Sequence, residues 1–150
     1  MENSPAPVSM HLDDQLCFAL YSASLRIQAL YRPRLKALGL TYSQYLVLLV
    51  LWAHPPAPGL TVSALGRPLF LDSATLTPLL KRMEKAGWVK RRRAREDERR
   101  VLVSLTDKAI DAQEAVRAVT AEVTCAAGLA TPDPHGLLAL LTGFRDGLEP

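Results

Sequence analysis

The sequence predicts a mainly α-helical domain with a small β-hairpin, and two stretches of the 150 residues carry this prediction. In residues 61–87, two short segments with apolar positions at helical spacing are joined by a tight connection at 70–72. Two runs of β-forming residues follow, at 88–91 and 101–105, and a dense charge cluster separates them. Helix, turn, helix and hairpin in this order are typical of a winged helix-turn-helix, which is a DNA-binding module.

The first helix is predicted over residues 13–30, where apolar side chains recur at helical spacing. Asp13 and Asp14 suit its first turn, because the helix dipole favours negative charge at the N-terminus. Pro33 lacks a backbone N–H and is therefore expected to end or bend this helix.

A second helix is predicted over residues 43–53, with Ser43 as its N-cap. The Pro-rich stretch 54–59 breaks the helical pattern after it. Thr61 is then expected to cap the short first helix of the helix-turn-helix.

The second helix of the helix-turn-helix is expected to begin at a cap formed by Asp72 or Ser73 and to end at Gly87. Glycine is the preferred residue just beyond a helix C-terminus. Pro78 lies inside this segment and removes one backbone donor, so we expect a bend or a late start. The two β-like runs come directly after this helix and complete the winged module.

The C-terminal part of the chain predicts a long helix over 107–127, capped by Thr106, and a last helix opened by Thr131 and Pro132. These helices and the first one each carry a broad apolar face that needs a partner, and a second copy of the chain is the expected one. We therefore expect one domain over 1–150. In it, dimerisation helices at about 10–35 and 107–148 flank a winged-helix lobe at about 43–105.

Composition indicates a globular protein, with 49% hydrophobic and 22% charged residues. The net charge of +3 is too small to indicate nucleic acid by itself, but seven basic residues lie between Lys90 and Arg100 against three acidic ones. No apolar run has the length of a membrane span, and residues 1–10 do not resemble a secretion leader. We therefore expect a cytoplasmic protein without a membrane partner, in which the two cysteines form no disulfide framework.

Two groups of polar residues are candidates for contact with double-stranded DNA. The recognition helix should present short hydroxyl and basic side chains to base edges and phosphates: Ser73, Thr75, Thr77, Lys81 and Arg82. The hairpin should form a wing whose arginines contact the minor groove or the phosphates: Arg91, Arg92, Arg93, Arg95, Arg99 and Arg100. The alternative for both groups is an ordinary solvated surface. His11, His54 and His135 lack ligand spacing, so we expect neither a metal nor a cofactor.

The string DSATLTPLLKRMEKAGWVKR followed by DERRVLVSLT resembles the winged-helix core of MarR-type transcriptional regulators. The strings LCFALYSASL and GLTYSQYLVLLVLW resemble one branch of that family, the OhrR repressors, which sense organic hydroperoxides. The resemblance covers roughly residues 13–128. The chain departs from the branch at Leu25, where a basic residue is common, and in its Pro-rich loop at 54–58.

The resemblance implies that Cys17 is oxidised by an organic hydroperoxide, and that Tyr31 and Tyr42 of the partner subunit hydrogen-bond to it. Tyr21 lies four residues after Cys17 and shares its helix face. On one straight helix Tyr31 lies roughly 21 Å from Cys17, at ~1.5 Å per residue, so only a partner's Tyr31 could approach the thiol. The alternative is that Cys17 is a small buried hydrophobic residue.

Cys125 corresponds by position to a second cysteine of some relatives, which implies a resolving thiol for a sulfenic acid at Cys17. The alternative is a core-facing helix residue. If it does resolve Cys17, an interchain bridge is expected, because the two cysteines belong to opposite ends of the helical frame.

These observations predict a homodimeric transcriptional repressor that binds operator DNA, senses organic hydroperoxides through Cys17 and then releases the operator. A second hypothesis is a MarR-type regulator released by a small phenolic ligand in the dimer crevice, with Cys17 incidental. A third is a thiol peroxidase that uses Cys17 and Cys125, although such an enzyme would have no need of a basic wing.

Overall fold

The computed structural model describes residues 9–97, 99–128 and 130–148, and it is mainly helical with one three-stranded antiparallel sheet. The elements, in chain order, are η1 (Leu12–Asp14), α1 (Leu16–Ala37), α2 (Tyr42–Trp52), β1 (Leu60–Thr61), α3 (Val62–Gly66), η2 (Arg67–Leu69), α4 (Ser73–Lys85), β2 (Val89–Arg93), β3 (Val101–Leu105), α5 (Asp107–Asp111), α6 (Gln113–Gly128) and α7 (Pro134–Asp146).

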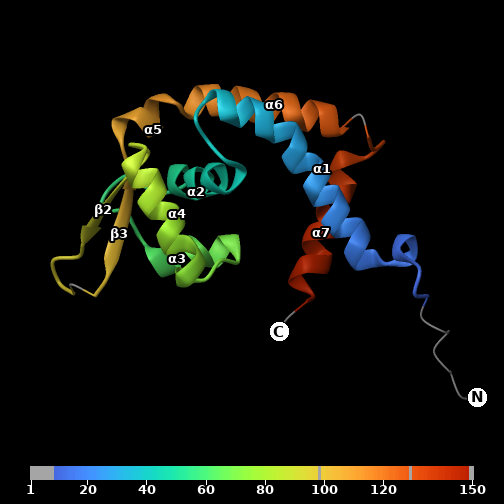
Figure 1. The fold of residues 1–150 in the computed structure, drawn as a ribbon, viewed down its shortest axis with the longest axis horizontal. Helices are drawn as coiled ribbons and strands as arrows, with labels where there is room; N and C mark the ends of the chain where they lie inside the picture. The colour runs from blue at the N-terminus through green and yellow to red at the C-terminus, as the bar shows by residue number, and fades with distance from the viewer. Residues whose placement is uncertain (1–8, 98, 129, 149–150) are drawn as a thin grey trace, which may run out of the picture.

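The molecule has two parts (Figure 1). A lobe contains α2, α3, α4 and the sheet, and a helical frame of α1, α6 and α7 extends beside it. The strand order is β1-β3-β2, so the hairpin of β2 and β3 projects from the lobe with the short β1 along its inner edge. This is the winged helix-turn-helix that the sequence predicts.

One apolar core holds the lobe together. Helix α2 contributes Val47 and Leu48, α4 contributes Leu76 and Leu80, and the sheet contributes Val103, all of them fully buried. Burial of a side chain of this size contributes roughly 1.5–3 kcal/mol. The core also extends along α1 and α6 and thereby fixes the lobe to the helical frame.

The predicted caps of the helix-turn-helix are confirmed. The Thr61 hydroxyl accepts a hydrogen bond from the Ala64 N–H at 3.2 Å, and the Asp72 carboxylate accepts one from the Thr75 N–H at 2.7 Å. Gly87 follows the α4 C-cap with φ +78°, a left-handed conformation that glycine adopts without steric cost.

Several predicted boundaries are wrong. Helix α1 starts at Leu16 and continues through Pro33 to Ala37, because the last turns are held by burial of Tyr31 and Leu35. Asp13 and Asp14 consequently lie in the preceding 3-10 turn. Helix α4 has the predicted bounds, Ser73 to Lys85, so the late start that Pro78 suggested is wrong.

Other boundaries differ at the start or within an element. Helix α2 is capped by Thr41 rather than Ser43, because Thr41 and Gln44 form a reciprocal capping box. The predicted long helix over 107–127 is two helices separated at Ala112. The last helix begins at Pro134 with Asp133 as its cap, and β1 is an element that the sequence pattern did not predict.

Among the described residues, no single helix is both long and apolar enough to cross a membrane. Helices α1 and α2 reach that length and hydropathy only as a pair, and the chain bends by 80° between them.

Candidate nucleic-acid interface and cysteine sites

Helix α4 separates an apolar face from a polar one. Leu76, Leu79, Leu80 and Met83 are buried in the lobe core. The polar residues predicted to contact DNA lie on the other side, where Thr77 is half-buried and the remaining ones are exposed: Ser73, Thr75, Lys81 and Arg82. Hydrogen bonds from Thr75 hold the pKa of the capping Asp72 carboxyl below its ordinary value, so the cap is ionised and positions the first turn at neutral pH.

The arginines of the wing fall into two groups. Arg91 is tied to α4, because its backbone N–H and its Nε donate to the Glu84 carboxylate at 3.0 and 2.9 Å. The hydrogen bond from the Arg91 side chain lowers the pKa of Glu84, so this pair stays charged well below neutral pH. The other five wing arginines are exposed and form no ion pair with the described residues: Arg92, Arg93, Arg95, Arg99 and Arg100.

The tip of the wing is closed by backbone hydrogen bonds. The Arg99 N–H donates to the Asp97 carboxylate at 3.0 Å, and the Arg100 N–H donates to the Asp97 carbonyl at 2.9 Å. Asp97 therefore holds the tip through backbone donors, and neither guanidinium group has a partner among the described residues.

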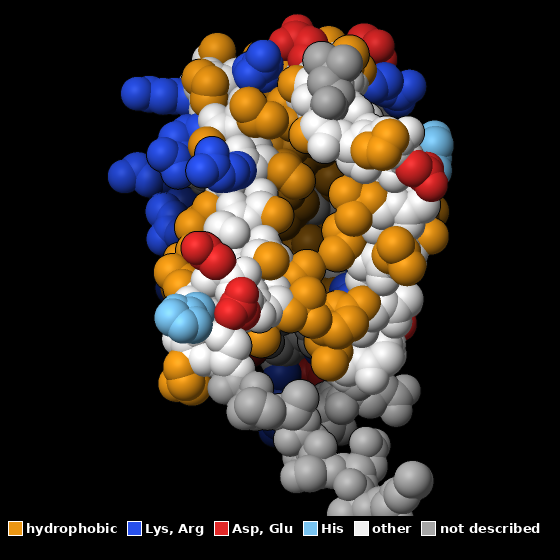
Figure 2. Space-filling view, turned by 90° about the vertical axis from the view of Figure 1, so that its right-hand side faces the viewer, with side chains coloured by type: hydrophobic (Ala, Val, Ile, Leu, Met, Phe, Trp, Pro, Cys, Tyr) orange, Lys and Arg blue, Asp and Glu red, His pale blue; other side chains and the backbone are white. Residues whose placement is uncertain are grey.

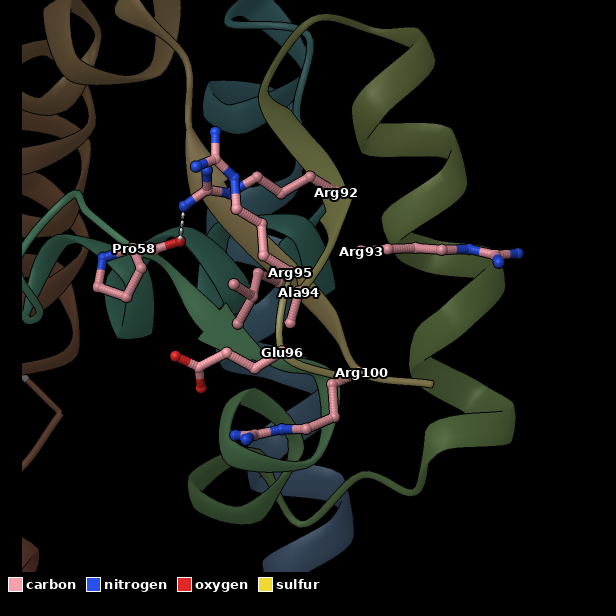
Figure 3. A pocket seen from close by; sticks show the side chains of 8 residues that line it. Pro58, Arg92, Arg93, Ala94, Arg95, Glu96 and Arg100 are labelled. Carbon is pink, nitrogen blue, oxygen red and sulfur yellow. Dashed lines mark hydrogen bonds between the residues drawn. The ribbon is translucent and has the colours of Figure 1, made fainter. Parts of the chain in front are cut away.

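A hollow of about 520 Å³ lies between the wing and the Pro-rich loop. Figure 3 shows Arg92, Arg95, Glu96 and Arg100 around it, while Arg93 points in the opposite direction, toward α4. The Arg92 guanidinium crosses the hollow and donates to the Pro58 carbonyl at 3.1 Å.

Both cysteines are free and exposed in the single chain. Cys17 lies in the first turn of α1 and Cys125 in the last turns of α6. The alternative that Cys17 is a small buried residue is wrong for the isolated chain, and so is the core-facing alternative for Cys125.

An ion pair places the two cysteines relative to each other. The Arg34 Nε atom of α1 lies 2.8 Å from the Glu122 Oε2 atom of α6. Cys125 comes about one helical turn after Glu122. Ile27 and Thr124 line the same groove, so Cys125 lies near the level of Ile27. Cys17 is ten residues before Ile27, roughly 15 Å along the helix at ~1.5 Å per residue. A disulfide needs Cα atoms within about 7 Å, so this arrangement disfavours a bridge within one chain.

Of the three predicted tyrosines, Tyr31 and Tyr42 pack together and Tyr21 lies apart from them. Tyr21 is 61% exposed and lies one turn after Cys17. Tyr31 is buried against Tyr42 and Tyr45, with ring centroids 5.2 and 5.1 Å away. Tyr31 and Cys17 belong to the same helix fourteen residues apart, so they cannot touch within one chain.

Sequence reasoning missed Tyr45. Its hydroxyl lies 3.5 Å from the Tyr31 hydroxyl and 3.0 Å from the Thr120 hydroxyl, and so connects α1, α2 and α6. Burial is the main cause that raises the pKa of Tyr31, and the hydrogen bond with the Tyr45 hydroxyl raises it further. Burial also raises the pKa of Tyr42. Both phenols are therefore protonated hydrogen-bond donors at neutral pH. The spacing of Tyr42 and Tyr45, three residues apart on one helix face, was the available signal.

An apolar groove of about 250 Å³ runs between α1, α6 and α7. Figure 2 shows hydrophobic side chains along both edges of the hollowed face that α1 and α7 form. Tyr31 lines the groove, and α7 borders it with side chains that are 41–63% exposed: Leu137, Leu138 and Leu141. In the part of the chain that the structure describes, no group of three or more His, Cys, Asp or Glu could hold a metal ion.

Comparison with known proteins assigns the fold to a family. The family of SarA/Rot transcriptional regulators matches residues 29–116. The HTH-type transcriptional regulator TtmR of Methylorubrum extorquens is 46% identical over 138 residues, which cover 92% of this chain and 69% of that protein. This chain belongs to the MarR-type winged-helix transcriptional regulators.

This MarR-type regulator is similar to a regulator of organic hydroperoxide resistance and to AbfR, which has been solved in reduced and disulfide forms. The organic hydroperoxide resistance transcriptional regulator of Bacillus subtilis is 53% identical over 98 residues, and the match covers 65% of this chain and 65% of that protein. Reduced AbfR bound to DNA superposes with a TM-score of 0.76 at 38% identity over 93% of each chain. AbfR comes from Staphylococcus epidermidis, and its disulfide form superposes with a TM-score of 0.66 at 39% identity over 93% of this chain and 94% of that chain. These relatives are DNA-binding transcriptional regulators and not enzymes, which disfavours the thiol-peroxidase alternative.

Proposed function

We propose that this MarR-type regulator is a homodimeric repressor that binds operator DNA and releases it when an organic hydroperoxide oxidises Cys17. The observation that carries the proposal is an exposed Cys17 at the start of α1, in a chain 53% identical over 98 residues to an organic hydroperoxide resistance regulator. A protein with this function acts on DNA in the cytoplasm.

A second copy of the chain is the proposed occupant of the apolar groove. Helices α1 and α7 leave large hydrophobic side chains in water, among them Leu138 at 63% and Leu140 at 73% exposure. Exposed apolar faces of this extent on two adjacent helices are typical of a dimer interface. If the two α1 helices of such a dimer cross antiparallel, Tyr31 of one subunit would approach Cys17 of the other, which one chain cannot achieve.

The proposed reaction begins at the Cys17 thiolate, which is the reactive form of a cysteine. The sulfur attacks the distal oxygen of the hydroperoxide, the O–O bond breaks, the alcohol leaves with the hydroperoxide proton, and a sulfenate remains. The sulfur is oxidised by two electrons and the hydroperoxide is reduced by two. Phenol donors from the partner would position the thiolate and stabilise its charge.

The second step is condensation with Cys125 of the partner subunit. The sulfenic acid and the thiol form a disulfide and release water, which balances the step without another oxidant. Cys17 lies roughly 15 Å along α1 from the level of Cys125 in the same chain, and this separation disfavours the reaction within one chain. AbfR, which is 39% identical, has been solved with a disulfide formed, and this supports such chemistry here.

On DNA, α4 is proposed to enter the major groove and the wing to lie over the adjacent minor groove. Ser73, Thr75 and Thr77 would contact base edges, and Lys81 and Arg82 would contact guanine or phosphate. The exposed wing residues would contact phosphates or the minor groove: Arg93, Arg95, Arg99 and Arg100.

The function is tested with the reduced wild-type protein and a duplex that this protein selects from a randomised DNA pool. Titration with cumene hydroperoxide should dissociate the complex, and dithiothreitol should restore binding if the product is a disulfide. A duplex that stays bound after Cys17 is oxidised, as judged by mass spectrometry, would refute the proposal.

The Cys125→Ser variant tests the resolving thiol. Peroxide-treated wild type should migrate as a covalent dimer on a non-reducing gel, whereas Cys125→Ser and Cys17→Ser should both migrate as monomers. If the treated wild type forms no interchain species, Cys125 is a structural residue and the sulfenic acid persists, reacts with a small thiol or is oxidised further.

The tyrosine hydroxyls are tested by Tyr31→Phe and Tyr42→Phe. A hydrogen bond to a charged group contributes about 1.5–3 kcal/mol, so we expect Cys17 oxidation to slow by about tenfold or more. Stopped-flow mixing with cumene hydroperoxide measures the rate, and DNA affinity of the reduced protein should remain near that of the wild type. Equal rates in both variants and the wild type would exclude the phenols from the mechanism.

The two DNA-contacting groups are expected to respond differently to substitution. Arg95→Met should weaken binding to selected and scrambled duplexes alike and lower the slope of log affinity against log salt by about 0.9 for each phosphate that is no longer neutralised. Thr75→Val should weaken only the selected duplex, by about 1–3 kcal/mol for each base that it no longer contacts, and leave the slope intact. Titrations at several salt concentrations distinguish these outcomes. If a wing variant keeps both the affinity and the salt slope of the wild type, the charge cluster is an ordinary solvated surface.

A further inference from the structure

The Pro-rich loop at 54–59 has no part in the proposed sensing reaction, yet it is built against the wing. Strand β1 follows the loop directly and pairs with β3, with Leu60 opposite Val103. Gly59 makes this approach possible: its φ is +94°, and a Cβ atom there would lie 2.5 Å from the Val103 carbonyl oxygen. The backbone of the loop therefore lies directly on the hairpin that carries the wing.

The side chains of β2 alternate between the two sides of the hairpin. Arg91 lies on the α4 side and is held there by Glu84, with an Nη2 to Oε2 distance of 2.8 Å. Arg92 lies on the opposite side and donates to the Pro58 carbonyl at 3.1 Å, as Figure 3 shows. The hairpin is thus held from both sides, by a carboxylate of α4 and by a carbonyl of the loop.

We propose that the Pro-rich loop braces the wing through the Arg92 to Pro58 hydrogen bond, so that Arg92 is a positioning residue and not a DNA contact. Prolines restrict the backbone of the loop, so its carbonyl is presented at a fixed place. A fixed acceptor on one side and Glu84 on the other set the angle at which the wing leaves the lobe. The hairpin is then already ordered when the other wing arginines that have no ion pair with the described residues contact the phosphates: Arg93, Arg95, Arg99 and Arg100.

This inference rests on the DNA binding of the proposed function but not on hydroperoxide sensing. It predicts that Arg92, unlike its neighbours, does not contribute to the salt dependence of DNA binding. A cation that contacts a phosphate releases counterions and contributes to the salt dependence of binding, whereas a cation bonded to the protein does not.

The test compares four full-length proteins in the reduced state: wild type, Arg92→Met, a loop variant and the combination of the two. The loop variant replaces residues 55–58 by Gly-Ser-Gly-Ser, which removes the proline restraint and no charge. Arg95→Met is the matched control, because it removes one guanidinium from the same hollow. Each protein is titrated with the duplex selected by the wild type at several salt concentrations, and circular dichroism confirms that each is folded.

Arg92→Met and the loop variant should each bind about fivefold more weakly with the wild-type salt slope. Their combination should be no weaker than either alone, because both remove the same brace. Arg95→Met should instead lower the salt slope.

Three results would overturn the inference: a lowered slope for Arg92→Met, losses that multiply in the combined variant, or unchanged affinity in Arg92→Met. If the wild type enriches no duplex from the pool, the proposed DNA binding fails instead, and this outcome is distinct from a failure of the brace alone.

Discussion

Replacing Cys17 with serine is expected to give a protein that binds its selected duplex as the wild type does but is not released by an organic hydroperoxide. Cys17 is exposed and has no hydrogen-bonded partner among the described residues, so serine should leave the reduced structure unchanged. Coupling between two sites is typically worth about 5- to 150-fold in affinity, and we expect the wild type to lose binding on this scale after oxidation. Fluorescence anisotropy before and after cumene hydroperoxide measures the difference.

The control for this prediction is Cys125→Ser. It keeps the sensing thiol, so oxidation of Cys17 should still release the duplex. If Cys17→Ser is released as readily as the wild type, Cys17 is not the sensor. Release of both proteins by a small phenolic acid, with no response of either to peroxide, would instead favour a phenol-responsive regulator with Cys17 incidental.

Charging the apolar face of α7 is expected to convert the dimer to a monomer and to abolish tight DNA binding. Leu138 and Leu141 border the groove between α1, α6 and α7. A carboxylate at each position would have to be buried without a partner, which is strongly unfavourable. Because linked binding of two half-sites raises affinity by about 10²- to 10⁴-fold, we expect a loss of this size in a Leu138→Asp, Leu141→Asp variant.

Light scattering after gel filtration gives the mass of the variant, and titration with the selected duplex gives its affinity. The matched control is His135→Asp, which adds a negative charge to the same helix at an exposed polar position and should remain dimeric. A charged variant that remains dimeric and binds DNA normally would show that the exposed leucines of α7 face water and that the interface lies elsewhere.

The helix-turn-helix and the wing could be predicted from local sequence because each depends on neighbouring residues. The caps at Thr61 and Asp72 and the turn at Gly87 act over three or four positions, and a pattern of apolar residues on α4 fixes its buried face. Arg95, Arg99 and Arg100 lie in the connection between β2 and β3, and the charge cluster between the two β-forming runs indicated this exposed tip.

The continuation of α1 and α4 past their prolines could not be predicted in this way. Pro33 and Pro78 each remove one helical hydrogen bond, and local rules therefore end or bend the helix there. The helices continue because Leu35 and Leu80, which follow these prolines, are fully buried against other elements. Burial outweighs the missing bond only when the partner elements are in place.

By itself, the sequence determined the class of this protein, the face of α4 that is the candidate for DNA contact and the cysteine that is a candidate sensor. The tertiary structure decided which charges are free: Arg91 and Arg92 have protein partners on opposite sides of β2, and no pattern in a run of arginines distinguishes them from Arg93. It also decided that Tyr45 joins Tyr31 to Thr120. These contacts join residues far apart in the chain, and their geometry exists only after the core has brought the helices and the hairpin together.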